Sequence, residues 1–510
     1  MKTIQLFFTL AFFATTIFAQ SQTRSYQYAI DLLNIQDDKV TVSFSPPKNN
    51  LKQGKFIIPK MVPGYYDAMN FGQYVSDFIA LDKTGKEMLT ERLDKNSWMV
   101  HDLKNVANIS YRVADGWDSL QQNTQGAKSA ASTFIKDSVF VINYNSLVGY
   151  FQEMNDFSYK INIKKSKDFF ASSALNYRHE NDSIDIFSVK SYRELVDAPV
   201  LYCVPDTTWI KVGNAEVLIS FYNKEERHYS KKIVDELENI LKNQRAYLGG
   251  KLPVDKYAFL IYYEPSKGQG ILGDGLEHAQ STVCLYSSSS INYLPQALNA
   301  VASHEFFHIV TPLNIHSREI ENYDFLNPTL SKNLWLYEGM TEYATIHMPI
   351  KQKKISLKEF TGKIEEKIHG MEGFNNKLSF TELSKNAVER QDQYMNFYQK
   401  GALLGLCLDI KLRELSSGKM GTQELMQQLM KKYGKGKYFN DDALFDKITA
   451  MTFPEIRAFF SDYIEGGDPI PLKECLEKVG LEYDETTKTI NPINNPNTRQ
   501  LALRKAWINQ

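Results

Sequence analysis

The stretch that decides the fold of this chain reads SHEFFHI over residues 303–309. It contains the pattern His-Glu-x-x-His, which places His304 and His308 four positions apart. Residues four apart share one face of a helix, so both imidazoles can bind the same metal ion. Glu305, beside His304, can then take a proton from a water at the metal. The pattern predicts a metal-binding helix over residues 297–310.

A second stretch, LWLYEGMTE over residues 334–342, reads as the start of another helix. It offers Glu338 as a third ligand. Glu338 stands among apolar neighbours, where a carboxylate without a partner would be costly to bury. Two imidazoles, one carboxylate and an open position form the zinc site of hydrolases. We therefore expect one Zn²⁺ per chain, bound by His304, His308 and Glu338.

The composition is that of an ordinary globular protein. Of 510 residues, 43% are hydrophobic and 23% charged, and the formal net charge is -1. A chain of this length is expected to form two to four domains. The balanced charge argues against electrostatic binding of nucleic acid or of an anionic membrane.

Residues 1–19 have the features of a secretory signal peptide. A short basic start is followed by an apolar run over residues 6–18, and Ala19 suits a cleavage site. The run is short for a membrane span, although an uncleaved anchor is the alternative. No later segment is apolar enough to span a bilayer. We expect an exported protein, periplasmic or secreted, without stable membrane insertion after cleavage.

The pattern of polar and apolar residues changes twice along the remaining chain. Residues 20–210 alternate polar and apolar positions in short runs, which predicts a β-sandwich-like domain. Residues 211–350 mix strand patterns with helical ones, and residues 351–480 are mainly helical in period. Residues 481–510 are rich in Asn, Pro, Thr and charge, and we expect a poorly packed extension there. Together these patterns predict a multi-domain α+β fold.

Glycines are dense in GQGILGDGLEH over residues 268–278. They permit unusual backbone angles and close approach of a ligand to the main chain. Their spacing does not match a dinucleotide-binding loop. The four cysteines, Cys203, Cys284, Cys407 and Cys475, form no C-x-x-C pair and therefore no metal cluster by spacing. Cys407 lies in an apolar run that favours burial, and the disulfide pairing is left open.

Four motifs in order resemble the glycyl aminopeptidase family of gluzincin metallopeptidases. They are GLEH at 275–278, HEFFH at 304–308, WLYEGMT at 335–341 and YQKGA at 398–402. The resemblance covers roughly residues 217–476, and the Pro-Gly-Tyr turn at 63–65 is similar to the β-domain of that family. It implies a thermolysin-like catalytic domain over residues 211–350 followed by an α-helical domain over residues 351–480.

The resemblance also implies roles for single residues. Glu305 matches the general base, and Tyr398 matches a tyrosine that donates a hydrogen bond to the developing oxyanion. Glu277, in the segment with Gly275 and Leu276, matches the position that meets the free amino group of the substrate. Such a carboxylate favours aminopeptidase action, because only a chain terminus carries that charge. Glu342 is similar to a carboxylate that orients a histidine ligand. Apart from the family, Tyr398 reads more readily as a core aromatic, one of 29 tyrosines in the chain.

Three departures from the family pattern stand out. Asp274 lies where two glycines often precede Leu-Glu-His, which leaves open whether amine recognition is altered. Residues 309–312 differ from the tryptophan-bearing continuation of the family, so the details of the substrate pocket are open too. Fewer than thirty residues follow Leu481, too few for the C-terminal PDZ domain that members commonly carry.

These observations predict an exported zinc aminopeptidase that acts on peptides, favouring N-terminal Gly or Ala. One alternative is a zinc endopeptidase in which Glu277 is merely structural. Another is a non-catalytic peptide-binding protein, against which Glu305 argues because a binding module needs no general base. The biological substrate and the oligomeric state are not determined by the sequence.

Overall fold

The computed structural model describes the chain except for residues 1–24, 121–124, 226–227, 267–270, 435 and 510. The predicted signal peptide and residues 268–270 of the glycine-dense segment lie outside the described residues. The chain divides into two compact units. The first comprises Met1–Thr208, Leu218–Ser230 and Ala258–Glu264, and the second comprises Trp209–Val217, Lys231–Tyr257 and Pro265–Gln510. The sheets and the helices are described below in turn.

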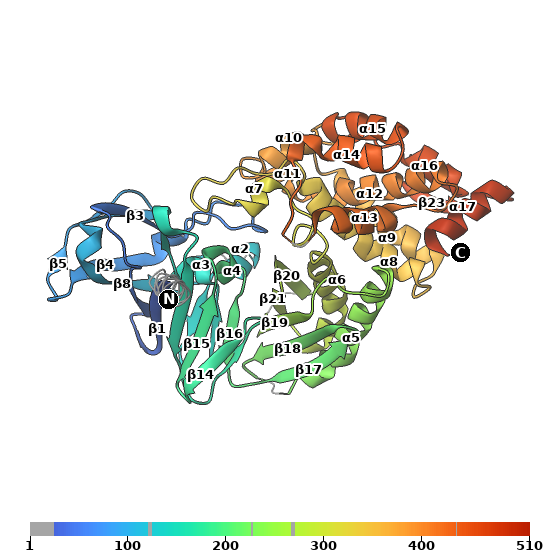
Figure 1. The fold of residues 1–510 in the computed structure, drawn as a ribbon. Coiled ribbons are helices and arrows are strands. Elements are labelled where there is room, and N and C mark those ends of the chain that lie inside the picture. Colours follow the sequence, from blue (N-terminus) through green and yellow to red (C-terminus); the bar gives the residue numbers. More distant parts are fainter. Residues whose placement is uncertain (1–24, 121–124, 226–227, 267–270, 435, 510) are drawn as a thin grey trace, which may run out of the picture. The chain divides into compact units, whose positions relative to one another are not determined.

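The first unit is built from sheets (Figure 1). Its largest sheet has the order β14 (Tyr177–Asn181), β15 (Ile184–Val189), β12 (Ser158–Lys164), β1 (Ser25–Gln36), β2 (Lys39–Ser45), β8 (Val106–Ala114), β4 (Val75–Asp82), β5 (Glu87–Met88). A second sheet has the order β13 (Phe170–Ser172), β16 (Val200–Cys203), β10 (Val139–Ile142), β9 (Thr133–Ile135). The third has the order β11 (Tyr150–Phe151), β3 (Gln53–Ile57), β7 (Ser97–His101), β6 (Thr90–Arg92). Short helical turns connect the strands: η1 (Phe71–Tyr74), η2 (Leu103–Asn105), α2 (Gln125–Ala130), α3 (Tyr144–Leu147), η3 (Gln152–Met154) and α4 (Tyr192–Val196).

Alternation of side chains explains how two of these sheets pack together. Every second residue of β1 from Tyr26 to Leu32 is buried, because successive side chains of a strand point to opposite faces. The ring of Tyr28 stacks on Phe44 of β2 at 4.5 Å between centroids. Phe44 in turn stacks on Phe56 of β3, in the other sheet, at 5.3 Å. The predicted β-rich N-terminal region is thus present, with two sheets joined face to face by aromatic rings.

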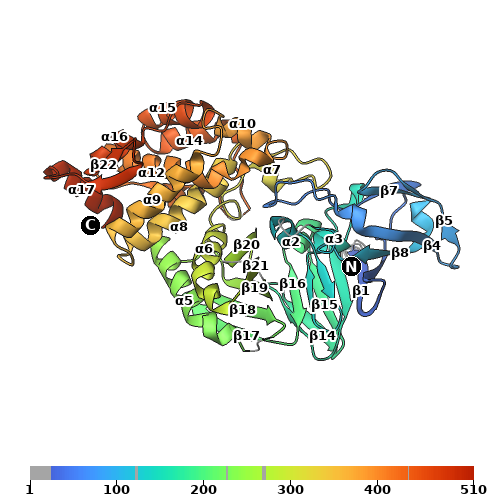
Figure 2. The same ribbon diagram turned by 180° about the vertical axis from the view of Figure 1, so that it is seen from behind.

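The next sheet has five strands in the order β17 (Thr207–Val212), β18 (Ala215–Asn223), β19 (Lys256–Pro265), β21 (Ser281–Ser288), β20 (Ile271–His278). Strand β20 stands at one end of this order, so among the described residues only one of its edges is paired. Helix α6 (Leu294–Phe307) carries the His-Glu-x-x-His pattern and packs on β20 and β21. It lies beside these two strands in both ribbon views (Figures 1 and 2). The sheet and α6 thus bring two of the sequence motifs side by side.

Besides α6 and the short helices of the first unit, the described chain contains further helices on both sides of α6 in the sequence. They are α5 (Ser230–Tyr247), η4 (Ile291–Tyr293), α7 (Arg318–Glu321), the π-helical turn η5 (Trp335–Gly339), α8 (Met340–Lys351), α9 (Leu357–Met371), α10 (Phe380–Lys385), α11 (Gln391–Tyr394), α12 (Asn396–Leu415), α13 (Thr422–Tyr433), η6 (Asp441–Ala443), α14 (Leu444–Met451), α15 (Glu455–Phe460), η7 (Ser461–Glu465), α16 (Leu472–Lys478) and α17 (Thr498–Ile508). A small hairpin of β22 (Leu481–Asp484) and β23 (Thr489–Pro492) lies between the last two. The predicted multi-domain α+β fold is confirmed. The predicted boundary between residues 350 and 351 stays a prediction, since both sides lie in one compact unit.

Helix α6 begins and ends three residues earlier than the sequence pattern predicts. Pro295 lies in its first turn, where the missing N–H is not needed. At the other end, the backbone N–H groups of His308 and Ile309 bond to carbonyls three residues back, which tightens the last turn. His308 is therefore the residue that ends the helix, four positions after His304.

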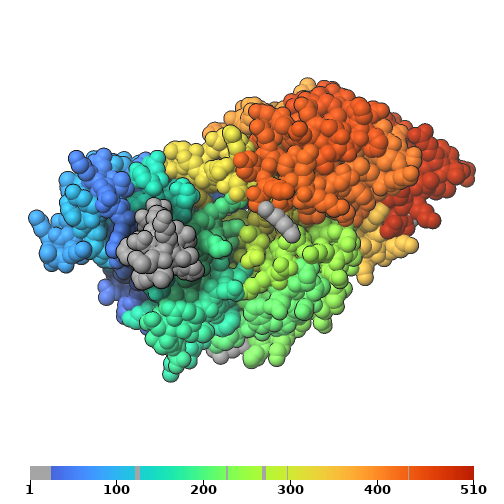
Figure 3. Space-filling view, viewed as in Figure 1, coloured from blue at the N-terminus to red at the C-terminus, as the bar shows by residue number. Residues whose placement is uncertain are grey.

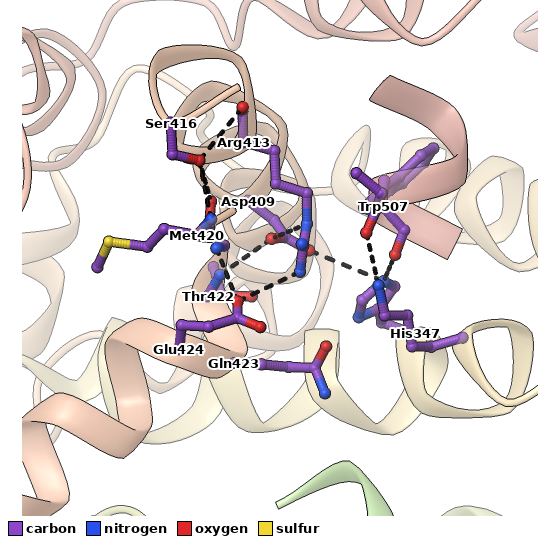
Figure 4. A network of polar contacts seen from close by, with 12 residues as sticks. His347, Asp409, Arg413, Ser416, Met420, Thr422, Gln423, Glu424 and Trp507 are labelled. Carbon is purple, nitrogen blue, oxygen red and sulfur yellow. Dashed lines mark hydrogen bonds and ion pairs between the residues drawn. The ribbon is translucent and has the colours of Figure 1, made fainter. Parts of the chain in front are cut away.

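The C-terminal segment is packed, so the expectation of a poorly packed extension at 481–510 is wrong. Trp507 is fully buried. Its carbonyl accepts a hydrogen bond from His347 of α8 at 3.0 Å (Figure 4). Its indole N–H donates to Tyr343 at 2.8 Å. Asn497 and Gln500 form a capping box that begins α17. In Figure 3 the orange-to-red C-terminal residues form one continuous surface.

Two further predictions concern cysteines and membrane spans. Cys203, Cys284, Cys407 and Cys475 are all free and buried in the described chain, as expected for Cys407. None of the helices that the structure describes is long and apolar enough to cross a membrane.

Candidate metal centre

Three predicted ligands meet in the second unit. Nε2 of His304 lies 3.4 Å and Nε2 of His308 3.7 Å from Oε2 of Glu338, and all three side chains are buried. Ligand atoms about 2.0–2.2 Å from a tetrahedral zinc ion are separated from one another by about 3.4 Å. The observed spacing therefore fits a zinc ion held between these atoms.

The second nitrogen of each imidazole is already bonded. Nδ1 of His304 donates to Oε2 of Glu342 at 2.8 Å, and Nδ1 of His308 donates to the carbonyl of Thr311 at 2.9 Å. These bonds leave the Nε2 lone pairs facing Glu338. Nε2 of His304 and Oε2 of Glu338 are buried without a hydrogen-bond partner in the described structure. A cation would satisfy both atoms, which is the second reason that the site fits a metal.

A close contact of two glycines brings Glu338 and Tyr398 together. A Cβ atom on Gly339, at the end of the π-helical turn, would lie 2.9 Å from Cα of Gly401 in α12. Because neither residue has a side chain, α12 can approach the turn closely. The hydroxyl of Tyr398, one turn before Gly401, then comes near Glu338. Despite burial, it helps His308 and His304 to hold the pKa of that carboxyl below its usual range. The ring of Tyr398 lies 5.3 Å from that of His304.

Another glycine makes room for Glu305. Gly275 lies in β20, and a Cβ atom added there would be 2.5 Å from Cγ of Glu305. Gly273 and Gly275 do not use the unusual backbone angles that glycine permits, because both pair regularly with β21. The expected close approach is present, but the approaching group is the Glu305 side chain.

Strand alternation sorts the residues of the Gly-Leu-Glu-His motif. Glu277 is buried on the same face of β20 as Gly275, and its carboxylate belongs to a group with Glu305 and His308 whose polar atoms lie within 4.8 Å of one another. Leu276, between them, is buried on the opposite face. The structure thus brings Glu277 to the metal site and does not bring the side chain of Leu276 there.

The carboxylates of the centre carry more negative charge than the imidazoles offset. Burial, reinforced by the charges of Glu338 and Glu305, raises the pKa of Glu277 well above its usual range. Burial also raises the pKa of Glu305 to about 8, although His304 opposes the shift. Burial disfavours a charged His304, but the nearby carboxylates of Glu338 and Glu342 raise its pKa to about 10. All three shifts indicate that the centre favours added positive charge.

One residue of the centre was missed at the sequence level. Nζ of Lys367, in α9, lies 2.5 Å from Oε1 of Glu342. Lys363 stands one turn earlier in the same helix and is exposed. Nothing in the sequence distinguishes these two lysines.

Comparison with known families agrees with this geometry. Residues 27–204 match the family described as "Peptidase M61 N-terminal domain", and residues 297–404 match the family described as "M61 glycyl aminopeptidase". The chain belongs to the M61 glycyl aminopeptidase family. As a member it is a zinc metallopeptidase, with His304, His308 and Glu338 forming the zinc site. The predicted resemblance and the predicted enzyme class are confirmed.

Solved structures resemble this M61 peptidase in fold. An aminopeptidase N family protein from Idiomarina loihiensis has a TM-score of 0.78 at 21% identity, and the match covers 90% of this chain and 78% of the other. An M1 zinc metallopeptidase variant from Deinococcus radiodurans, bound to a Tyr-Ser-Ala substrate, has a TM-score of 0.53 at 10% identity, covering 88% and 95%. A two-domain M1 variant bound to L-arginine has a TM-score of 0.51 at 10% identity, with the same coverage. No curated protein matches the sequence.

Proposed function

We propose that this M61 peptidase removes residues from the free N-terminus of peptides, with Glu277 binding the substrate amine. The observation that carries the proposal is the burial of Glu277 beside Glu305 and His308. A buried carboxylate needs a cationic or hydrogen-bonding partner. The ammonium group of a peptide N-terminus supplies a cationic partner, whereas an internal peptide bond supplies only a neutral N–H donor.

The charge balance of the centre supports the same conclusion. The carboxylates of Glu277, Glu305 and Glu338 are buried and that of Glu342 is partly buried, and together they contribute four negative charges when all are ionised. A zinc ion and Lys367 together contribute three positive charges. One negative charge is left over, and the ammonium of the substrate balances it.

The remaining residues supply the chemistry of peptide hydrolysis. When bound, zinc would polarise the scissile carbonyl and acidify a water molecule. Glu305 accepts the proton of the attacking water and passes it to the leaving amine. The Tyr398 hydroxyl donates a hydrogen bond to the carbonyl oxygen as negative charge develops on it. Glu305 is held for this task between α6 and Gly275 of β20.

Three finer points belong to the proposal. A preference for N-terminal Gly rests on the family description alone, and Ala is included because it has the next smallest side chain. One zinc ion per chain rests on the group of His304, His308 and Glu338. Export to the periplasm or the medium rests on the apolar run at residues 6–18, and N-terminal sequencing of the mature protein tests it.

The decisive test compares a free peptide such as Ala-Ala-Phe with its N-acetylated form. We expect hydrolysis of the free peptide only. Glu277→Gln should lower kcat/KM for it by ~10²-fold or more, the cost of removing one partner of a buried charge pair. Equal cleavage of both peptides would establish the endopeptidase alternative. Absence of cleavage by zinc-loaded protein over a range of free peptides would favour the peptide-binding alternative.

A further inference from the structure

A chain of polar contacts leads from the zinc site to a third helix. Nδ1 of His304 in α6 donates to Oε2 of Glu342 in α8 at 2.8 Å. The other oxygen of that carboxylate, Oε1, lies 2.5 Å from Nζ of Lys367 in α9. The side chains of Lys367 and Glu342 are 16% and 15% exposed, so water competes little for this pair.

The contacts assign one task to each oxygen of Glu342. A carboxylate rotates easily about its terminal bond, because that torsion has broad, shallow minima. With Oε1 bonded to Lys367, the carboxylate is fixed with Oε2 toward His304. His308 needs no such support, because its Nδ1 donates to the backbone carbonyl of Thr311. Of the two histidine ligands, therefore, only His304 depends on a pair of side chains for its orientation.

We propose that Lys367 is a positioning residue of the zinc centre, which holds Glu342 so that His304 presents Nε2 to the metal. Lys367 touches neither the metal ligands nor the reacting atoms, so it acts through Glu342. The inference rests on the zinc site and not on the proposed aminopeptidase activity. Its failure would leave that activity untouched.

A purely electrostatic role for Lys367 predicts the opposite effect on metal binding. Removing a positive charge near a dication should tighten its binding by reducing repulsion. Loss of orientation of a ligand should weaken it, by the 10- to 100-fold typical of lost partners of metal-ligating histidines. The direction of the change therefore separates positioning from charge.

The test measures zinc affinity by competition with a chromogenic chelator, using full-length protein with Lys367→Met, Lys367→Gln and Lys367→Arg. The matched control is Lys363→Met, which removes the same charge from an exposed lysine one turn earlier in α9. We expect ~10- to 100-fold weaker zinc binding in the Met and Gln variants, partial recovery in the Arg variant, and no change in the control.

Thermal unfolding of the metal-free proteins completes the test. We expect the metal-free Lys367→Gln variant to unfold close to the wild type, which shows that the lost affinity is not lost folding. Wild-type or tighter zinc binding in the Met and Gln variants would overturn the proposal. A lower unfolding temperature with unchanged zinc affinity would also overturn it, because Lys367 would then merely join α8 to α9.

Discussion

Gly275→Ala is expected to impair catalysis by moving Glu305, without removing the metal. The new Cβ atom would lie 2.5 Å from Cγ, 2.7 Å from Cδ and 2.9 Å from Oε1 of Glu305. Carbon atoms in contact prefer about 3.5–4.0 Å, so the Glu305 side chain must shift by roughly 1 Å. The backbone of Gly275 is ordinary strand, so alanine adds no strain of its own.

The size of the effect follows from this shift. A misplacement of about 1 Å in a catalytic group can lower the rate ~10²-fold. That factor corresponds to about 2.7 kcal/mol of lost transition-state stabilisation. We therefore expect kcat to fall ~10²-fold, while His304, His308 and Glu338 retain zinc because none of them contacts Gly275 among the nearest atoms.

Steady-state kinetics on a free peptide, with zinc content measured on the same samples, provide the assay. The matched control is Gly273→Ala, two residues earlier on the same face of β20. Its Cβ would meet Tyr286 at 2.9 Å and Val301 at 3.1 Å rather than Glu305. Unchanged kcat in Gly275→Ala, or an equal loss in both variants, would refute the reasoning. So would loss of zinc in proportion to loss of activity.

Three other substitutions test the remaining parts of the centre and its support. Glu305→Gln should retain zinc near one ion per chain, as measured by metal analysis, and should lower turnover by ~10²–10⁴. Full activity of this variant would contradict the role of Glu305 as the base. Tyr398→Phe should lower kcat by ~10²–10³ with little change in KM, whereas a raised KM with unchanged kcat would contradict an oxyanion donor. Burial lowers the pKa of His347 to about 4. The charge of Asp409 opposes this shift, and the charge of Arg413 adds to it (Figure 4). Since an unfolded histidine has a pKa of about 6.5, the wild type should lose stability as pH falls from 6.5 toward 4, by about 2 kcal/mol at pH 5. Denaturant unfolding at pH 7.5 and pH 5 should show that the His347→Gln variant does not lose this part of its stability. An equal loss of stability in the variant and the wild type would contradict the role of His347.

Local patterns explain what could be predicted. The alternation in residues 26–32 and 39–44 predicts β1 and β2, because the period of two is a property of the strand itself. Helical spacing likewise predicts the helix-rich region of residues 351–480, which contains α9, α12 and α13, but it does not fix where each helix begins and ends. Ends depend on caps and tertiary contacts, which spacing alone does not contain.

The C-terminal segment shows how composition can mislead. Residues 481–510 contain many polar residues, but Leu503 and Trp507 are four positions apart and both are buried. The signal was present in that spacing and in the capping box of Asn497 and Gln500. Average composition over thirty residues hides such a short periodic run.

The sequence by itself determined the metal ligands of this M61 peptidase, because His304 and His308 are related by one turn of a single helix. It also determined the residue types of the site, since Glu338 and Tyr398 stand in recognisable motifs. Only the tertiary structure decided that Gly339 meets Gly401, that Gly275 makes room for Glu305, and that Lys367 rather than Lys363 reaches Glu342. These contacts join residues far apart in the chain, and their distances depend on how whole helices and strands pack.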